Sequence, residues 1–308
     1  MLRPSQKKRT KLTISVVGAG RLGTALARAL FLADHSIQAL VSRRASQAKA
    51  AAALVDRSAA ALSIDQLHHL PSSKLILITT PDDKIAEIAQ KLAVLEREPL
   101  KGSAVLHTSG ALSSDILSPL ADQGIHVGSL HPLVSVSDSR AAATIFSGAF
   151  FCLEGDAPAV RIARAIVDSL KGKSFSIPSE DKPLYHAAAV MASGHVVALF
   201  DLAMTMLVQC GLSETKARRV LLPLLHSTVK NLTTAEPARA LTGTFARGDL
   251  VTVKRHLKAL SASGIPATLE IYKLLGTKSL ELASESHLDP KVLKQIQREL
   301  ELIIGRKQ

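Results

Sequence analysis

A glycine pattern near the start of the chain has the spacing of a phosphate-binding loop. Six consecutive residues fit GxGxxG: Gly18, Ala19, Gly20, Arg21, Leu22 and Gly23. In such a loop the first glycine permits a tight turn, the second lets a pyrophosphate approach backbone N–H groups at a helix start, and the third allows a helix to pack closely on a strand. Because the pattern directly follows the β-branched run TISVV, it predicts dinucleotide binding; a glycine turn that only joins a strand to a helix is the alternative.

The residues at the end of the second expected strand indicate which dinucleotide is bound. NAD sites usually carry an acidic residue about 20 residues after the glycines, where it binds the ribose 2′-hydroxyl. This chain has Ser42, Arg43 and Arg44 at that place. A 2′-phosphate suits this trio, because arginine makes charge-assisted, bidentate contacts with phosphate. The sequence therefore favours NADP over NAD, with FAD a weaker competitor and two solvated arginines the alternative.

Three further segments follow expected strands and could meet the reactive end of the cofactor. They are Thr79–Asp82, His107–Gly110 and Ser129–Pro132. Ligands of open α/β sheets bind at the carboxyl ends of strands, so Thr80 and Pro81 are expected along the cofactor. Histidine titrates near neutrality, which makes His131 a candidate to supply or relay a proton, and the Ser109 hydroxyl could orient a carbonyl oxygen. A histidine that only satisfies loop backbone groups is the alternative, and for His107 it is the preferred one.

Polar residues in the second half could complete such a site. At 100° per residue, His186 and Ser193 fall on one stripe of an expected long helix, with Lys182 where that helix begins. Lys182 and His186 would set the charge around the reacting group, and Ser193 would contact the substrate. Arg247, beside a glycine turn, could bind a carboxylate bidentately or pair with Asp249. We therefore expect NADPH to reduce a small anionic ketone or imine, resembling a 2-oxo acid, in a cleft between two domains.

The elements that position these residues change character along the chain. In the first half, short strands alternate with helices, which predicts an α/β Rossmann domain with a mostly parallel sheet. The expected strands are Thr13–Val17, Ile37–Val41, Leu75–Ile78, Ala104–Leu106, Ile125–Val127, Phe150–Leu153 and Ser174–Ile177. The expected later helices, which form an all-α domain, are Pro183–Cys210, Glu214–Leu232, Val251–Ser261, Ile265–Leu275 and Pro290–Ile303. The predicted domains are a basic tail over 1–11, the Rossmann domain over 12–178 and a helical substrate and dimerisation domain over 179–308.

Composition limits the other classes of function. The net charge is +12 over 308 residues, but part of it lies in the tail and the chain has no tryptophan, so specific nucleic-acid binding is not expected. Two cysteines without CxxC spacing favour a cytoplasmic protein without a zinc site or other metal. The apolar stretch Ala187–Leu207 contains Asp201 and His195, which favours a buried helix over a membrane span. Its apolar residues also predict a homodimer.

Six segments together resemble a known family. They are GAGRLG, TTPDD, HTSG, SLHPL, DKPLYHAAAVMASGH and ALTGTFARGD. In this order they resemble the bacterial Rossmann-like NADP oxidoreductases with a C-terminal helical domain of unknown function. That family lies within the 6-phosphogluconate dehydrogenase-like superfamily, whose members include ketopantoate reductases, pyrroline-carboxylate reductases and prephenate dehydrogenases. The resemblance implies NADP binding and an undefined substrate.

The resemblance also bears on single residues. SLHPL is similar to the His-Pro motif that carries a catalytic histidine in prephenate dehydrogenases, which favours His131 and Ser109. Many superfamily members use a lysine four residues before an asparagine; here Lys182 precedes His186, and the asparagine is absent. Thr244 stands where the family tends to have proline.

Two other functions remain open from the sequence. The first is a redox sensor that binds NADP without turning anything over, because the cofactor motifs are stronger than the substrate motifs. The second is nucleic-acid binding, which rests on charge alone.

Overall fold

The computed structural model describes residues 11–95, 103–140, 143–285 and 288–302. The chain divides into two compact units, Met1–Ser193 and Gly194–Gln308. The predicted basic tail lies outside the described residues except for Lys11, which is exposed.

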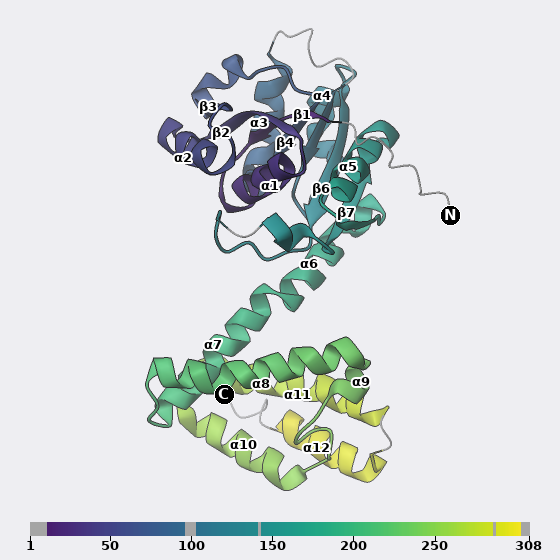
Figure 1. Cartoon of the computed structure of the whole chain (residues 1–308). Helices are drawn as coiled ribbons and strands as arrows, with labels where there is room; N and C mark the ends of the chain where they lie inside the picture. The colour runs from purple at the N-terminus through teal and green to yellow at the C-terminus, as the bar shows by residue number, and fades with distance from the viewer. Residues whose placement is uncertain (1–10, 96–102, 141–142, 286–287, 303–308) are drawn as a thin grey trace, which may run out of the picture. The chain divides into compact units, whose positions relative to one another are not determined.

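The described part of the first unit is built on one eight-stranded sheet of order β3-β2-β1-β4-β5-β6-β7-β8 (Figure 1). The strands are β1 (Thr13–Val17), β2 (Ser36–Ser42), β3 (Ala60–Ser63), β4 (Leu75–Ile78), β5 (Ala104–His107), β6 (His126–Pro132), β7 (Phe150–Gly155) and β8 (Lys173–Phe175). Neighbouring strands are parallel except β6 and β7, which are antiparallel. The predicted mostly parallel sheet is confirmed.

Helices pack on both faces of this sheet, which explains why almost every residue of its central strands β1, β4 and β5 is buried. The helices are α1 (Arg21–Leu32), α2 (Ala45–Val55), α3 (Asp82–Ala93), α4 (Ser118–Ala121), α5 (Ala157–Ser169) and α6 (Lys182–Ala192). One apolar cluster joins the sheet to α1, α2 and α5. A second joins the other face to α3 and α4. The carboxyl ends of the strands are left free to position polar side chains.

Strand β6 differs from its prediction in a way that matters for the site. The sequence predicted a strand over Ile125–Val127 and placed Ser129–Pro132 in the loop that follows. In the structure the strand continues to Pro132, because β7 pairs with it antiparallel as far as Phe151. His131 is therefore held at a fixed register opposite Cys152 instead of lying in a loop.

The other strand differences lie at the edges of the sheet. Strand β3 was not predicted; its residues are only partly buried, so they lack the apolar pattern of the central strands. Strand β8 comprises Lys173–Phe175 and ends before the predicted Ile177. Helix α6 belongs to the first unit by its contacts, whereas the predicted domain boundary lies after residue 178, where the sheet ends.

The described part of the second unit contains helices and no strands, as predicted. Its helices are α7 (Gly194–Gln209), α8 (Glu214–Thr234), α9 (Pro237–Ala240), α10 (Leu250–Ser263), α11 (Thr268–Ser284) and α12 (Pro290–Leu302). A small core joins α10, α11 and α12 (green to yellow in Figure 1) through Val253, Leu257, Leu280, Ile296 and Leu300. The helix predicted over Pro183–Cys210 is interrupted at Ser193, whose backbone is not helical.

Helix α7 corrects one expectation. The sequence predicted a buried helix over Ala187–Leu207, yet α7 has no buried residue in the single chain. Val197 is 70% exposed, because only part of the helix surface has a packing partner within the chain. By length and composition alone, Ser179–Gln209 would be long and apolar enough to cross a membrane.

Candidate functional site

The glycine loop joins β1 to α1 and requires glycine at its first position. Gly18 has φ +112°, a backbone conformation that residues with a Cβ rarely adopt. A Cβ there would lie 2.7 Å from the backbone carbon of Thr79 and the nitrogen of Thr80. The N–H groups of Gly18 and Ala19 both donate to the carbonyl of Val41, at 2.9 and 2.8 Å. These bonds hold the turn against β2 and β4.

The other two glycines of the loop have different surroundings. A Cβ on Gly23 would clash with the Gly18 carbonyl and the Thr79 hydroxyl, so this glycine lets α1 pack closely on the loop. A Cβ on Gly20 would meet no atom closer than the Gly18 carbonyl oxygen, at 3.9 Å, so the space beside Gly20 is open. It begins α1, which has no acidic residue in its first turn and no side-chain cap. The helix start therefore offers free N–H groups to an anion.

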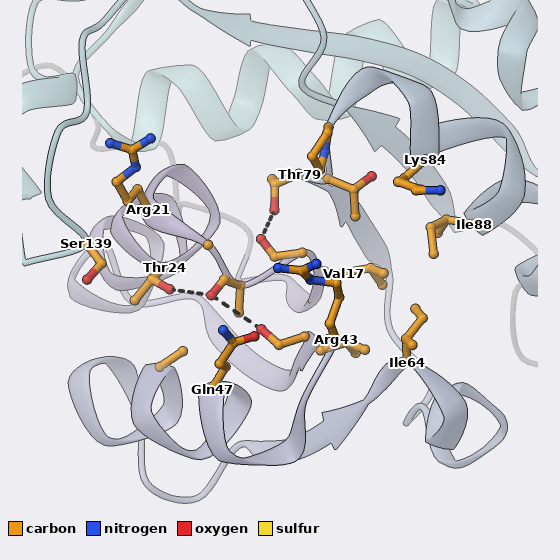
Figure 2. A pocket seen from close by; sticks show the side chains of 18 of the residues that line it. Val17, Arg21, Thr24, Arg43, Gln47, Ile64, Thr79, Lys84, Ile88 and Ser139 are labelled. Carbon is orange, nitrogen blue, oxygen red and sulfur yellow. Dashed lines mark hydrogen bonds between the residues drawn. The ribbon is translucent and has the colours of Figure 1, made fainter.

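A pocket of about 870 Å³ opens beside this loop (Figure 2). Eight predicted cofactor residues line it: Gly18, Ala19, Gly20, Arg21, Ser42, Arg43, Thr80 and Pro81. Three predicted residues do not: Leu22 packs partly buried against the core, Gly23 faces the Gly18 carbonyl, and Arg44 precedes α2. The buried Thr80 Oγ1 has no hydrogen-bond partner in the described structure. Such an orphaned hydroxyl fits a polar ligand in the pocket.

The wall after β2 carries the residues predicted to select the cofactor. Ser42 is the last residue of β2 and its hydroxyl donates to the Ala19 carbonyl at 3.4 Å. Arg43 is exposed and lines the pocket with Gln47, while Lys84 comes from α3 (Figure 2). Lys84 lies within 4 Å of Asp83 and Glu87, which also line the pocket, so Arg43 is the cation that directly follows β2, where no acidic residue stands.

A second group of polar side chains lies where β5 and β6 end. Nδ1 of His131 lies 2.6 Å from the Tyr185 hydroxyl of α6. The ring of His186, also on α6, meets that of His131 edge to face, with centroids 5.5 Å apart. A Cβ on Gly110 would lie 2.5 Å from His186 Nδ1 and 2.9 Å from His131 Nε2. Both imidazoles therefore converge beside Gly110, and the buried His186 Nδ1 has no partner in the described structure.

Two histidines of this group are held neutral. Burial, with the neighbouring His186 and Lys182, lowers the pKa of His131 to about 4. Burial, with the charge of Lys182, also lowers the pKa of His107 to about 4. His107 has both ring nitrogens engaged, one with the Ser113 carbonyl at 3.1 Å and one accepting from the Ser109 N–H at 3.2 Å. The preferred alternative for His107, a histidine that satisfies loop backbone groups, describes its contacts.

Ser109 is placed beside His131 but its hydroxyl is fully engaged. The proton goes to Asp82 Oδ2, at 2.8 Å. The oxygen accepts from the N–H groups of Ala111 and Leu112, both at 3.1 Å. The sequence predicted that this hydroxyl orients a carbonyl; in the structure that contact would require breaking the bond to Asp82.

Lys182 lies in the same region and is completely buried. Its Nζ donates to the Ser129 hydroxyl at 2.7 Å and lies 3.7 Å from Glu154 Oε2. Ser129 in turn donates to Glu154 at 3.0 Å. Glu154 also accepts from the N–H and hydroxyl of Ser114. Burial lowers the pKa of Lys182 and the Glu154 carboxylate opposes this. The sequence predicted a catalytic lysine, but with its side chain 0% exposed it reaches a substrate only through its charge.

The remaining two predicted residues have contacts within their own units. The Ser193 hydroxyl donates to the Ala189 carbonyl at 2.6 Å on the exposed side of the helix end. Arg247 lies in the second unit, where Asp249 caps α10 through the Thr252 N–H at 3.0 Å. Substrate contact by these two residues stays a prediction.

Sequence reasoning missed Tyr185, Glu154 and Asp82. Tyr185 directly precedes His186 and shares its helix, so a search for polar neighbours along α6 could have found it. Asp82 was included in the segment Thr79–Asp82 expected along the cofactor, but without its bond to Ser109, and Glu154 lies on a strand that carried no motif. Glu154 meets Lys182 through the antiparallel pairing of β6 and β7, which the sequence does not encode locally.

The fold and the glycine loop define a Rossmann-like domain joined to a helical one. Residues 2–132 match the profile of the Rossmann-like domain, and residues 149–279 match that of DUF2520, a domain of unknown function. The chain therefore combines a Rossmann-like domain with a DUF2520 domain, and the family resemblance of its motifs is confirmed. No curated protein matches the chain.

Solved structures share the fold over most of the chain. A Bacteroides fragilis protein, provisionally described as an NADP oxidoreductase, is 25% identical with a TM-score of 0.71, covering 88% of this chain and 98% of its own. Protein TM1727 from Thermotoga maritima is 26% identical with a TM-score of 0.68, covering 89% and 99%. A reductive aminase from Aspergillus terreus, in complex with NADPH and ethyl levulinate, is 17% identical with a TM-score of 0.60, covering 94% and 99%, which shows the fold alone. The chain thus has the architecture of NAD(P)-dependent oxidoreductases.

Proposed function

We propose that this chain is an NADP-dependent oxidoreductase that reduces a small ketone or imine. The observation that carries the proposal is that the pocket and the group around His131 are joined by adjacent residues after β4. Thr80 and Pro81 line the pocket beside the glycine loop, and the next residue, Asp82, accepts the Ser109 hydroxyl beside Gly110 and His131. A cofactor held in the pocket would have its reactive end directed toward the histidines, as ligands of open α/β sheets lie across strand ends.

The residues of the pocket fit this cofactor. The open side of Gly20 and the uncapped start of α1 suit a pyrophosphate, and the orphaned Thr80 hydroxyl suits a polar group farther along. Arg43 is our candidate for the 2′-phosphate, with Ser42 shaping the same wall. When bound, NADPH supplies the hydride.

His131 is the group proposed to act on the substrate. Because its pKa lies near 4, it is a neutral imidazole at pH 7, which donates one ring N–H and accepts at the other nitrogen. We assign it the donor role: it would donate a hydrogen bond from its N–H to the acceptor oxygen or nitrogen and stabilise the negative charge that develops there, and the proton that completes the product would come from solvent. His186 would close the other side of the same space beside Gly110.

Ser109 and Lys182 would act through their neighbours. The bonds from Ser109 to Asp82, Ala111 and Leu112 fix the loop that carries Gly110. Lys182, tied to Ser129 and Glu154, would hold the β6 end in place and contribute positive charge behind His131. Both are proposed as positioning residues.

An anionic substrate remains our proposal, with Arg247 to bind its carboxylate and Ser193 as a further contact. A homodimer is proposed because α7 and α8 expose apolar side chains such as Val197 and Leu224. A cytoplasmic location is supported by the free thiols of Cys152 and Cys210.

The experiment that tests the proposal is a turnover screen. The purified chain would be mixed with NADPH and a panel of 2-oxo acids and cyclic imines, and NADPH oxidation followed by absorbance, with His131→Asn as the inactive comparison. Oxidation with one substrate that His131→Asn abolishes supports the assignment. Tight NADPH binding without oxidation across the whole panel would instead favour a redox sensor.

A further inference from the structure

The bond between His131 and Tyr185 fixes more than the position of a ring. His131 lies on β6 and Tyr185 on α6, and the phenol oxygen is 2.6 Å from Nδ1. The two rings stand edge to face, at 88°, with centroids 5.5 Å apart. Because this contact is short and the rings are perpendicular, the imidazole has little freedom to rotate or to flip.

Both partners of this bond are neutral near pH 7. Burial is the main cause that lowers the pKa of His131 to about 4 and the main cause that raises the pKa of Tyr185 above its ordinary range. A neutral imidazole carries one N–H and one lone pair, so only two arrangements are consistent with the contact. The phenol donates to Nδ1, or Nδ1–H donates to the phenol oxygen.

The surroundings of Tyr185 decide between these arrangements. If Nδ1–H donated, the phenol proton would need another acceptor, and the other polar group bonded to Tyr185 is the buried Cys152 thiol. A thiol sulfur is a weak acceptor, whereas an imidazole nitrogen is a strong one. The phenol proton therefore goes to Nδ1, which leaves the ring proton of His131 on Nε2.

The Nε2 edge of His131 is the edge that faces Gly110, in the loop after β5. A Cβ on Gly110 would lie 2.9 Å from Nε2 and 2.8 Å from Cε1, so only glycine allows the loop to approach this edge. The unpartnered Nδ1 of His186 lies beside the same glycine. A donor at Nε2 therefore points away from the core and toward the loop after β5.

We propose that Tyr185 is a positioning residue that locks His131 in the Nε2–H tautomer and so presents its single N–H beside Gly110. The tautomer is a property of the chain itself, while its use in turnover rests on the proposed function. Because the phenol keeps its proton throughout the physiological pH range, the bond from Tyr185 to Nδ1 and the tautomer that it selects do not change with pH.

The experiment measures the tautomer directly. Protein labelled with 15N at histidine would be studied by long-range 1H–15N NMR at pH 7, where protonated and unprotonated ring nitrogens have distinct shifts. His131→Asn identifies the His131 resonances. The expected result is a protonated Nε2 and an unprotonated Nδ1 in the wild type, and a mixture of both tautomers in Tyr185→Phe.

The chain offers a matched control. Its only other tyrosine, Tyr272, lies 2.8 Å from Nδ1 of His256 in the second unit, with the rings at 89°. Tyr272→Phe removes the same hydroxyl from the same kind of pair, and should leave the His131 resonances unchanged. A protonated Nδ1 on wild-type His131, or identical His131 shifts in wild type and Tyr185→Phe, would overturn the proposal.

A second readout connects the tautomer to turnover. With a substrate from the screen, Tyr185→Phe should lower kcat about twofold with little change in KM, because roughly half of the His131 rings would then carry their proton on Nδ1 instead of Nε2. Tyr272→Phe should not alter kcat. If no substrate is found, the NMR result still decides the tautomer of His131. The tautomer proposal and the proposed oxidoreductase function can therefore fail independently.

Discussion

The two tyrosines of this chain sit in pairs of nearly equal geometry and very different surroundings. Tyr185 and Tyr272 each lie within 2.8 Å of a histidine Nδ1, and each pair of rings is edge to face. His131, in the first unit, is partly buried and has its pKa lowered to about 4. His256, in the second unit, is exposed on α10.

The difference shows that the pair alone does not make a site. Around His131 stand a buried lysine, a second imidazole with an unpartnered nitrogen, and a glycine that admits close approach. Among the described residues, His256 is exposed and pairs with Tyr272. Burial together with converging polar groups is what makes the first pair a candidate for chemistry.

The largest expected effect is a loss of unfolding free energy when an ion pair of either unit is broken. Lys182→Ala would leave Glu154 as a buried carboxylate without its cation, which costs roughly 3–5 kcal/mol of unfolding free energy. Lys254→Ala removes a comparable pair, Lys254 with Glu299 at 3.0 Å, whose lysine is 52% exposed. That loss should be at most about 1 kcal/mol. Urea unfolding followed by circular dichroism measures the unfolding free energy of both variants. Equal losses would contradict the difference between the buried and the exposed ion pair.

The next effect concerns turnover. His131→Asn should lower kcat/KM about a hundredfold, because the imidazole N–H that stabilises developing negative charge on the acceptor is lost. His256→Asn removes the matching imidazole of the second unit and should change kcat/KM by less than about twofold. Steady-state NADPH oxidation measures both variants. Similar losses in the two variants would remove the functional distinction between the pairs.

The buried histidines of the first unit also predict how stability depends on pH. An unfolded histidine titrates near pH 6.5, whereas His107 titrates near 4 in the fold. Between these values the unfolded chain binds more protons, so stability is complete above about pH 6.5 and falls as the pH drops toward 4. For His107 the loss by pH 4 should be about 3 kcal/mol. Urea midpoints measured from pH 7 to pH 4 test this; a stability that rises on acidification would show that the sign is wrong.

The smallest effect separates two adjacent arginines. Arg43 lines the pocket and Arg44 does not. Arg43→Ala should weaken NADPH binding about tenfold, the value of one charge-assisted hydrogen bond, and leave NADH binding unchanged. Arg44→Ala is the matched control and should change neither. Fluorescence titration of the two variants measures this, and equal effects on NADPH would place the 2′-phosphate elsewhere.

The sequence predicted the fold where local pattern and tertiary packing agree. TISVV followed by GAGRLG predicted β1, the loop and α1, because apolar run, turn and helix are adjacent in the chain. It did not predict β3, whose residues are only half-buried at the sheet edge, or the length of β6, which depends on pairing with β7. It also expected burial of α7 from composition, and the single chain does not bury it.

The residues of the candidate site could be predicted from the sequence, but their hydrogen-bond partners could not. His131, Ser109 and His186 were found from their places after strands or on a helix stripe. The saturated Ser109 hydroxyl and the enclosed Lys182 depend on Asp82 and Glu154, which come from distant segments. The sequence places Tyr185 beside His186, but its bond to His131 depends on the packing of α6 against β6.

Binding of NADP in the pocket beside the glycine loop can be measured by a direct titration. The purified chain would be titrated with NADPH and with NADH while the fluorescence of the reduced nicotinamide is followed. The account predicts saturable binding of both, with NADPH tighter by about tenfold because Arg43 contacts only its 2′-phosphate. Tighter binding of NADH, or binding of neither, would contradict the account.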